Sequence, residues 1–250
     1  MILYEGPSLL DGSPIVAIAT VGSNNVKTGP MVQTWIIRSD VDPVTASKQG
    51  ADASVCGDCP HRHATGGACY VTLFQAPLSV YKAYKRGVYS GIAADIKVWR
   101  ALEGGASVRL GAYGDPAAVP ADIWRVLVAN SKSGHTGYTH QWRNPVAAGL
   151  RTLCMASVDS DEDVRDAVAA GWRYFRVLAP GDSAPARSVE CLSDSKGKTC
   201  AECRMCDGAR PDRDIQPVSV WIAVHGARSS KFEAAVAATA KRVPGLRVVA

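Results

Sequence analysis

The sequence predicts an α/β fold, namely a partial (β/α)6 TIM-like barrel with a Cys-rich metal- or cluster-binding insertion near its C-terminus. Three observations lead to this prediction. The 250 residues are 47% hydrophobic and 20% charged, which suits one globular domain. Short apolar segments alternate with segments of helical spacing, as is typical of βα units. Eight cysteines are present, and seven of them fall into two groups.

Six segments are expected to form parallel strands, because each is a short apolar run between turn-forming residues. They are residues 31–38, 107–113, 136–142, 150–158, 172–178 and 218–224. Residues 14–21 give a further strand before them. Helices are expected over 120–130, 161–170 and 231–243, and Ser160 is the expected N-cap of the second. A closed barrel of this kind has about eight strands, so six predict a partial barrel.

The charge and hydropathy patterns permit a nucleic-acid-binding protein and argue against a membrane-spanning or secreted one. The net charge is +5 and the pI is about 8.8, which permits contact with nucleic acid without requiring it. No apolar run reaches the ~18 residues that a membrane span needs. The N-terminus lacks the basic and apolar regions of a secretory signal. We therefore expect a cytoplasmic protein with no membrane segment.

Two Cys-rich loops, residues 39–70 and 180–216, interrupt the alternation within a single domain of residues 1–250. Both loops are rich in Gly, Pro, Asp and Ser. Cysteines outside the secretory route seldom form a disulfide framework, so these are expected to be metal or cluster ligands. We expect metal binding, rather than a hydrophobic core, to order the two loops.

The C-terminal group has the spacing C-x2-C-x2-C, with a fourth cysteine separated from it by eight residues. Its members are Cys191, Cys200, Cys203 and Cys206. Four thiolates can close the coordination shell of one metal ion or cluster. The continuous triad is closer to ferredoxin spacing than to the paired knuckles of zinc sites, so iron–sulfur is preferred to zinc. A purely structural staple for the loop is the alternative.

The N-terminal group, Cys56, Cys59 and Cys69, has the spacing C-x2-C-x9-C and supplies only three thiols. The candidates for a fourth ligand are His61, His63, Cys154 or no protein group. An open coordination position is typical of a reactive metal centre, because a substrate can bind there. Closed structural zinc and unmetallated cysteines remain alternatives. Cys154, within an apolar segment, is expected to be a small buried core residue.

Polar residues follow the expected strands, where parallel βα folds gather their reactive groups. Asp115, His140 and Asp159 are the expected catalytic residues. The expected cofactor-binding residues are Gly111, Tyr113, Gly114 and Tyr138. The glycines would let a ligand approach the backbone closely. Each catalytic candidate also has a structural alternative: Asp115 can cap a turn, Asp159 can stabilise a helix start and His140 can pack against a helix.

Several segments resemble Cys-rich proteins of unknown function that are carried by phages and plasmids. They are residues 56–70, 110–120 (LGAYGDPAAVP), 137–143 (GYTHQWR), 155–159 (MASVD) and 199–208, spread over most of 31–226. The strand count and the cysteine loop after the first strand also resemble the radical S-adenosylmethionine superfamily. That superfamily has a partial (β/α)6 barrel and binds a [4Fe–4S] cluster in this loop. Many members carry an extra cluster domain, which the C-terminal cysteines match in type.

The motifs depart from that superfamily in two places. Its usual cluster motif is C-x3-C-x2-C, whereas this chain has C-x2-C-x9-C followed by Tyr70. Its glycine-rich S-adenosylmethionine contact corresponds to residues 111–115, but no Gly-Gly-Glu is present there. The resemblance therefore rests on architecture more than on motifs.

The resemblance implies an iron–sulfur enzyme with radical S-adenosylmethionine-type chemistry. One or two [4Fe–4S] clusters, S-adenosylmethionine and an electron donor would be needed. A nucleotide or nucleic-acid substrate is expected from basic residues that could receive phosphates, namely Lys82, Lys85, Arg86, Lys97 and Arg100. One alternative is a zinc-containing barrel transferase acting on nucleic-acid bases, with Asp115 and Asp159 as acid/base and nucleophile. The other is a non-enzymatic, metal-stapled nucleic-acid-binding protein. If phage- or plasmid-encoded, the protein would act in a bacterial host's cytoplasm.

Overall fold

A computed structural model describes all residues of the chain except 24, 226–228, 233 and 235–250. The helix expected over 231–243 therefore lies almost entirely outside the described residues. Across the described part of the chain, no helix is long and apolar enough to span a membrane. This finding agrees with the expectation of no membrane segment.

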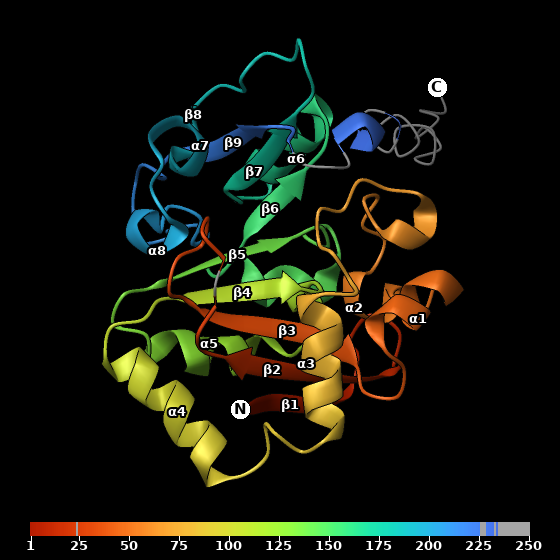
Figure 1. The fold of residues 1–250 in the computed structure, drawn as a ribbon. Helices are drawn as coiled ribbons and strands as arrows, with labels where there is room; N and C mark the ends of the chain where they lie inside the picture. Colours follow the sequence, from red (N-terminus) through yellow and green to blue (C-terminus); the bar gives the residue numbers. More distant parts are fainter. Residues whose placement is uncertain (24, 226–228, 233, 235–250) are drawn as a thin grey trace.

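The described residues form one mixed sheet of nine strands (Figure 1). The strands are β1 (Ile2–Pro7), β2 (Pro14–Thr20), β3 (Val32–Arg38), β4 (Val108–Tyr113), β5 (His135–Thr139), β6 (Met155–Val158), β7 (Tyr174–Leu178), β8 (Ser188–Glu190) and β9 (Ser219–Ala223). The order across the sheet is β1-β2-β3-β4-β5-β6-β7-β9-β8. All six strands expected to be parallel are present, although their ends differ from the prediction.

The strand pairing confirms the α/β class. β1, β2 and β3 pair antiparallel, whereas β3, β4, β5, β6, β7 and β9 pair parallel with one another in sequence order. Parallel neighbours in sequence order require crossover connections, which is what repeated βα units provide. A barrel is not shown: within the described residues the strand order is linear, with β1 and β8 at its edges.

The helices occupy the connections between the strands. They are α1 (Pro43–Gln49), α2 (Ala53–Cys56), α3 (Ala76–Lys85), α4 (Ile92–Glu103), α5 (Ala121–Ala129), α6 (Asp161–Ala169), α7 (Leu192–Lys196) and α8 (Cys200–Cys203). α3 contacts β3 and lies in front of the sheet in Figure 1, whereas α5 contacts β4 and lies behind it. Both helices bury apolar residues, including Val80 from α3 and Trp124 and Leu127 from α5. The sheet is thereby covered on two faces.

Helix α6 shows why its position could be predicted from the sequence. The Ser160 hydroxyl accepts a hydrogen bond from the Asp163 backbone N–H at 3.0 Å, and the Asp163 carboxylate accepts one from the Ser160 N–H at 3.0 Å. This reciprocal pair satisfies backbone donors that the first helical turn leaves without intrahelical acceptors. Ser160 is therefore the N-cap, as expected.

Two strands are shorter than the sequence indicated. β5 ends at Thr139 and β6 begins at Met155, so residues 140–142 and 150–154 lie outside the strands. The Asp115 carboxylate accepts a hydrogen bond from the His140 backbone N–H, and the Gln141 N–H donates to the Thr139 hydroxyl. These side-chain acceptors compete with a neighbouring strand for the same backbone donors, which ends the ladder.

The 180–216 segment is joined to the sheet more closely than a separate insertion would be. It contributes β8, which pairs parallel with β9 at one edge. Backbone N–H groups of Cys200 and Ala201 donate to the carbonyls of Lys27 and Thr28, at 2.9 and 3.0 Å. Backbone hydrogen bonds to β9 and to the turn before β3 therefore help to hold this segment, and its ordering by metal stays a prediction.

Candidate functional site

The carboxyl ends of the parallel strands gather residues from several distant segments. β3 and β4 point towards the side of the molecule that carries α1 and α2 (Figure 1). The loop that contains Cys56, Cys59 and Cys69 follows β3, Asp115 follows β4, His140 follows β5 and Asp159 follows β6. Parallel strands place their carboxyl ends on one edge, so this arrangement is a consequence of the topology.

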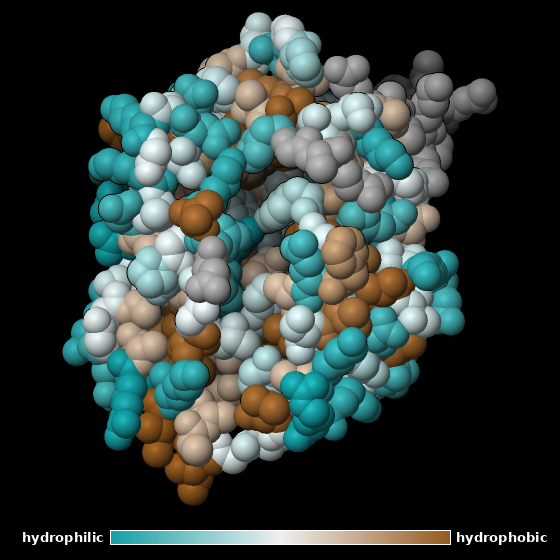
Figure 2. Space-filling view, in the orientation of Figure 1, coloured by the Kyte–Doolittle hydropathy of each residue, from teal (hydrophilic) through white to brown (hydrophobic). Residues whose placement is uncertain are grey.

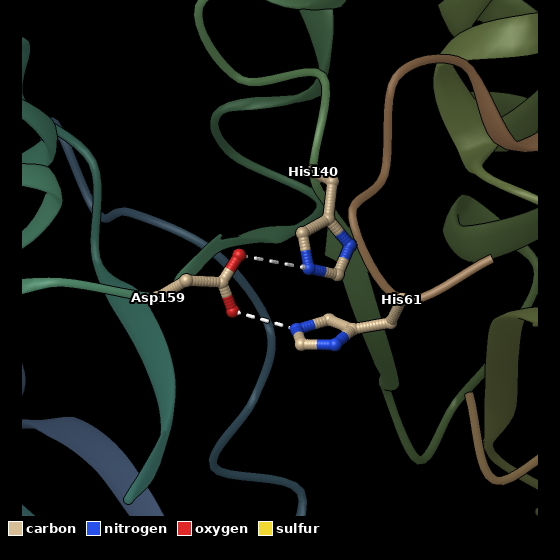
Figure 3. Close-up of side chains that lie close together, drawn as sticks. All are labelled: His61, His140 and Asp159. Carbon is tan, nitrogen blue, oxygen red and sulfur yellow. Dashed lines mark hydrogen bonds and ion pairs between the residues drawn. The ribbon is translucent and has the colours of Figure 1, made fainter. Parts of the chain in front are cut away.

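Asp159 faces two imidazole rings (Figure 3). Its Oδ1 lies 2.8 Å from His61 Nε2, and its Oδ2 lies 3.7 Å from His140 Nε2. The two rings meet edge to face, with centroids 5.6 Å apart, and the His61 ring also stacks on Phe232, with centroids 5.1 Å apart. Side-chain exposure is only 12% for His61 and Asp159 and 24% for His140. The group is thus shielded from bulk water.

The electrostatics of this group favour a charged carboxylate beside a neutral imidazole. Burial acts to raise the pKa of Asp159, but the hydrogen bond from His61 and the nearby His140 and Arg176 outweigh it, so the pKa lies below its ordinary value. Burial lowers the pKa of His140, and the attraction of Asp159 offsets this only in part. Asp159 is therefore ionised at neutral pH, while the His140 ring carries a free lone pair.

Asp115 holds the ends of β4 and β5 together. Its carboxylate accepts hydrogen bonds from the Ala117 N–H at 2.9 Å, the Thr139 hydroxyl at 2.7 Å and the His140 N–H at 2.8 Å. Burial raises its pKa to about 6, against the effect of these hydrogen bonds. The structure thus gives Asp115 a positioning role for His140. Its expected part in catalysis stays a prediction.

The first cysteine group lies beside Asp159. Burial raises the pKa of Cys56 and Cys59 well above the usual thiol value. Nearby Cys59 and Cys69 raise the pKa of Cys56 further, and Asp159 and Cys69 do the same for Cys59. The Cys59 sulfur accepts a hydrogen bond from the His61 backbone N–H. Across the described residues, no three cysteine sulfurs lie within 4.8 Å of one another. The thiols are neighbours without being in mutual contact.

Two of the expected fourth ligands are placed elsewhere. His63 Nε2 lies 2.9 Å from the Val71 carbonyl oxygen. Cys154 is fully buried in the main hydrophobic core, as expected for a small apolar residue. His61 lies close to the cysteine group but its ring faces Asp159.

The second cysteine group lines a pocket together with residues of β5, β8 and β9. Helix α8, which carries Cys200 and Cys203, lies on the opposite side of the molecule from α2 (Figure 1). Cys191, Cys200, Cys203 and Cys206 share this pocket with Tyr138. The Tyr138 hydroxyl and the Cys206 thiol are hydrogen-bonded, and burial raises the pKa of Cys206 to about 12. Figure 2 shows that the face turned to the viewer is hollowed over β4 and β5. Tyr138 belongs to the lining of this pocket, and Asp159 does not.

Gly111 and Gly114, which were expected to contact a cofactor, lie against backbone of the chain itself. Gly111 has φ +67°, and a Cβ there would lie 2.6 Å from the Gly114 carbonyl oxygen. Gly114 has φ +82°, and a Cβ there would lie 2.6 Å from the Ile36 carbonyl oxygen. Tyr113 is buried near Cys56. The close approach that requires these glycines is thus made by neighbouring backbone.

Two contacts of the 39–70 segment were not expected from the sequence. Gln141 Nε2 donates to Asp58 Oδ1 at 2.7 Å and to the Cys56 carbonyl at 3.3 Å, which joins the cysteine loop to the end of β5. Arg109 donates to the Tyr70 hydroxyl at 2.6 Å. Nothing in local spacing indicates either pair, because their members lie far apart in the sequence.

The chain matches no family model, no curated protein and no solved structure. The function must therefore be argued from the site itself.

Proposed function

We propose that this protein is an iron–sulfur enzyme with radical S-adenosylmethionine-type chemistry. One observation carries the proposal: the three-cysteine loop follows the first parallel strand and lies beside Asp159 at the carboxyl ends of β4, β5 and β6. In this proposal the six parallel strands form a partial barrel, and the edge that gathers these residues is its reactive end.

The donor set of the first group suits an iron–sulfur cluster. A tetrahedral zinc ion with Zn–S bonds of about 2.3 Å holds its sulfurs about 3.8 Å apart. In a cluster each thiolate binds its own iron, so the sulfurs stand farther apart. Across the described residues no three cysteine sulfurs lie within 4.8 Å of one another, so no tetrahedral thiolate site is preformed there. Three ligands also leave one iron for S-adenosylmethionine.

The bound groups would supply the electron chemistry, and the protein's residues would position them. A reduced cluster supplies one electron for cleavage of S-adenosylmethionine. Cys56, Cys59 and Cys69 would hold the cluster in a buried environment. Gln141 fixes the cysteine loop against β5 through Asp58 and the Cys56 carbonyl, which limits movement of the ligands.

The second group would hold another cluster or a zinc ion. Arg109 and Lys27 lie near Cys200 and lower its pKa in part, although burial and the other thiols raise it overall. Positive charge of this kind offsets the charge of a thiolate-bound centre. A nucleotide or nucleic-acid substrate and an external electron donor complete the proposal.

The test is the metal and sulfide content of protein purified without oxygen. The wild type should contain iron and acid-labile sulfide in equal amounts and show visible sulfide-to-iron absorption. Cys59→Ala should lose the cluster of the first group, whereas Cys154→Ala, a matched control in the apolar core, should keep it. The reduced wild type should cleave S-adenosylmethionine with one electron to methionine and a 5′-deoxyadenosyl radical, which takes a hydrogen atom from the substrate or the reductant and is measured as 5′-deoxyadenosine.

Three results would contradict the proposal. They are colourless protein without iron, an iron content of Cys59→Ala equal to that of the wild type, and iron-loaded protein that leaves S-adenosylmethionine intact after reduction. Stoichiometric zinc in place of iron would favour the zinc-containing alternative.

A further inference from the structure

We propose that His61, His140 and Asp159 form a mononuclear site for a divalent transition-metal ion, separate from the thiols of both cysteine groups. The side chains come from three parts of the fold: the loop after α2, the end of β5 and the end of β6. All three point towards one another (Figure 3). This inference does not depend on the proposed radical chemistry.

The distances fit one ion bound to all three side chains. Zn–N and Zn–O bonds of about 2.0–2.2 Å place neighbouring ligand atoms about 2.9–3.5 Å apart in tetrahedral or octahedral geometry. The observed separations from Asp159 are 2.8 Å to His61 Nε2 and 3.7 Å to His140 Nε2. One atom from each side chain lies within 4.8 Å of the others. Small side-chain rotations would complete the geometry.

The contact between His140 and Asp159 is incomplete without an ion. A separation of 3.7 Å is too long for a hydrogen bond, yet the ring nitrogen and the carboxylate oxygen face each other. A cation between them would bind both lone pairs. His61 needs only to exchange the proton that it shares with Asp159 for the same ion.

The backbone of each ligand is fixed by a neighbouring group. The Asp115 carboxylate accepts from the His140 N–H at 2.8 Å. The Asp163 carboxylate accepts from the Asp159 N–H at 3.0 Å. The Cys69 N–H donates to the His61 carbonyl at 2.8 Å. Such outer contacts orient metal ligands before the ion arrives, which reduces the ordering cost of binding.

The donor set indicates the class of ion. Two imidazole nitrogens and one carboxylate oxygen suit Zn²⁺ or Fe²⁺, whereas Mg²⁺ and Ca²⁺ prefer oxygen ligands alone. Three protein ligands leave at least one position for water or a substrate oxygen. In this arrangement His140 and Asp159 act as metal ligands rather than as an acid and a base.

The experiment uses Co²⁺ as a spectroscopic probe of anaerobically purified protein. Cobalt bound by imidazole and carboxylate gives weak visible bands, while cobalt bound by thiolate also gives an intense near-ultraviolet charge-transfer band. We expect a site with the weak bands alone. Asp159→Asn and, independently, His140→Ala should weaken Co²⁺ binding at this site at least about 100-fold. Circular dichroism would show that both variants fold.

The control is Asp166→Asn, which removes an exposed carboxylate from the same helix that Asp159 precedes. It should bind Co²⁺ as the wild type does. The inference is overturned if Asp159→Asn and His140→Ala both retain wild-type affinity. It is also overturned if all bound Co²⁺ shows the thiolate band. Neither outcome bears on iron content or S-adenosylmethionine cleavage, so the two proposals fail separately.

Discussion

Arg173 is the residue whose removal should most disturb the second cysteine group. Its side chain is 3% exposed. Nη1 donates to Asp207 Oδ1 at 2.7 Å and to the Gly208 carbonyl at 2.8 Å. Nη2 donates to the carbonyls of Met205 and Val218, each at 2.7 Å. One guanidinium thus connects the residues that flank Cys206 to the start of β9.

The expected cost of Arg173→Ala follows from these contacts. Removing one partner of a buried ion pair destabilises a protein by about 3–5 kcal/mol, because the remaining polar groups lose their partners. With a urea m value of about 3 kcal/mol per M, the midpoint should fall by roughly 1–2 M at unchanged m. The variant should also retain less metal at the second cysteine group than the wild type.

Arg210→Ala is the matched control for this prediction. Arg210 pairs with the same carboxylate, that of Asp207, but its side chain is 44% exposed. An exposed pair contributes about 0–1 kcal/mol. The reasoning is refuted if Arg173→Ala unfolds within about 1 kcal/mol of Arg210→Ala in urea titrations followed by circular dichroism.

Three further predictions concern the site edge. The Asp115 pKa of about 6 in the folded protein exceeds its ordinary value of 3.8, so the unfolded chain releases this proton at a lower pH than the folded protein does. As the pH rises from about 4 to about 6, the free energy of unfolding of the wild type should therefore fall by about 3 kcal/mol more than that of Asp115→Asn. Parallel pH profiles of the two proteins would contradict this. Gly57 has φ +60° and a Cβ there would overlap the Gln141 side chain, whereas Gly50 has φ +75° and open space. Gly57→Ala should therefore destabilise by about 1–3 kcal/mol more than Gly50→Ala, and equal urea midpoints would rule out the overlap. Ser160→Ala should cost about 1 kcal/mol in thermal unfolding through loss of its cap, and an unchanged melting temperature would argue against it.

The sequence predicted the positions of the parallel strands more accurately than the residues at which they end. The apolar run over 172–178 became β7 because its alternating residues could be buried on the sheet. The strand expected over 136–142 ends at Thr139, because the Asp115 carboxylate accepts a hydrogen bond from the next backbone N–H, that of His140. Asp115 lies 25 residues away from His140, so local patterns carry no sign of this competition.

The candidate site was predicted in part for a similar reason. Strand-end reasoning selected His140 and Asp159 separately, and the structure brings them together. It grouped Tyr138 with the glycines after β4, whereas the structure places Tyr138 with Cys206. Period-two alternation over 136–142 would place Tyr138 and His140 on one face of a strand. Because β5 ends at Thr139, His140 lies beyond the strand and that expectation does not hold.

The sequence by itself determined the α/β class, the six parallel strands, the capping of α6 and the division of the cysteines, because these depend on local apolar periodicity and spacing. The tertiary structure decided that the strand order is linear, that the 180–216 segment joins the sheet through β8, and that His61 meets Asp159. Such contacts join residues up to 98 positions apart. They form only when the crossover connections bring separate strand ends to one edge, and no local pattern encodes that meeting.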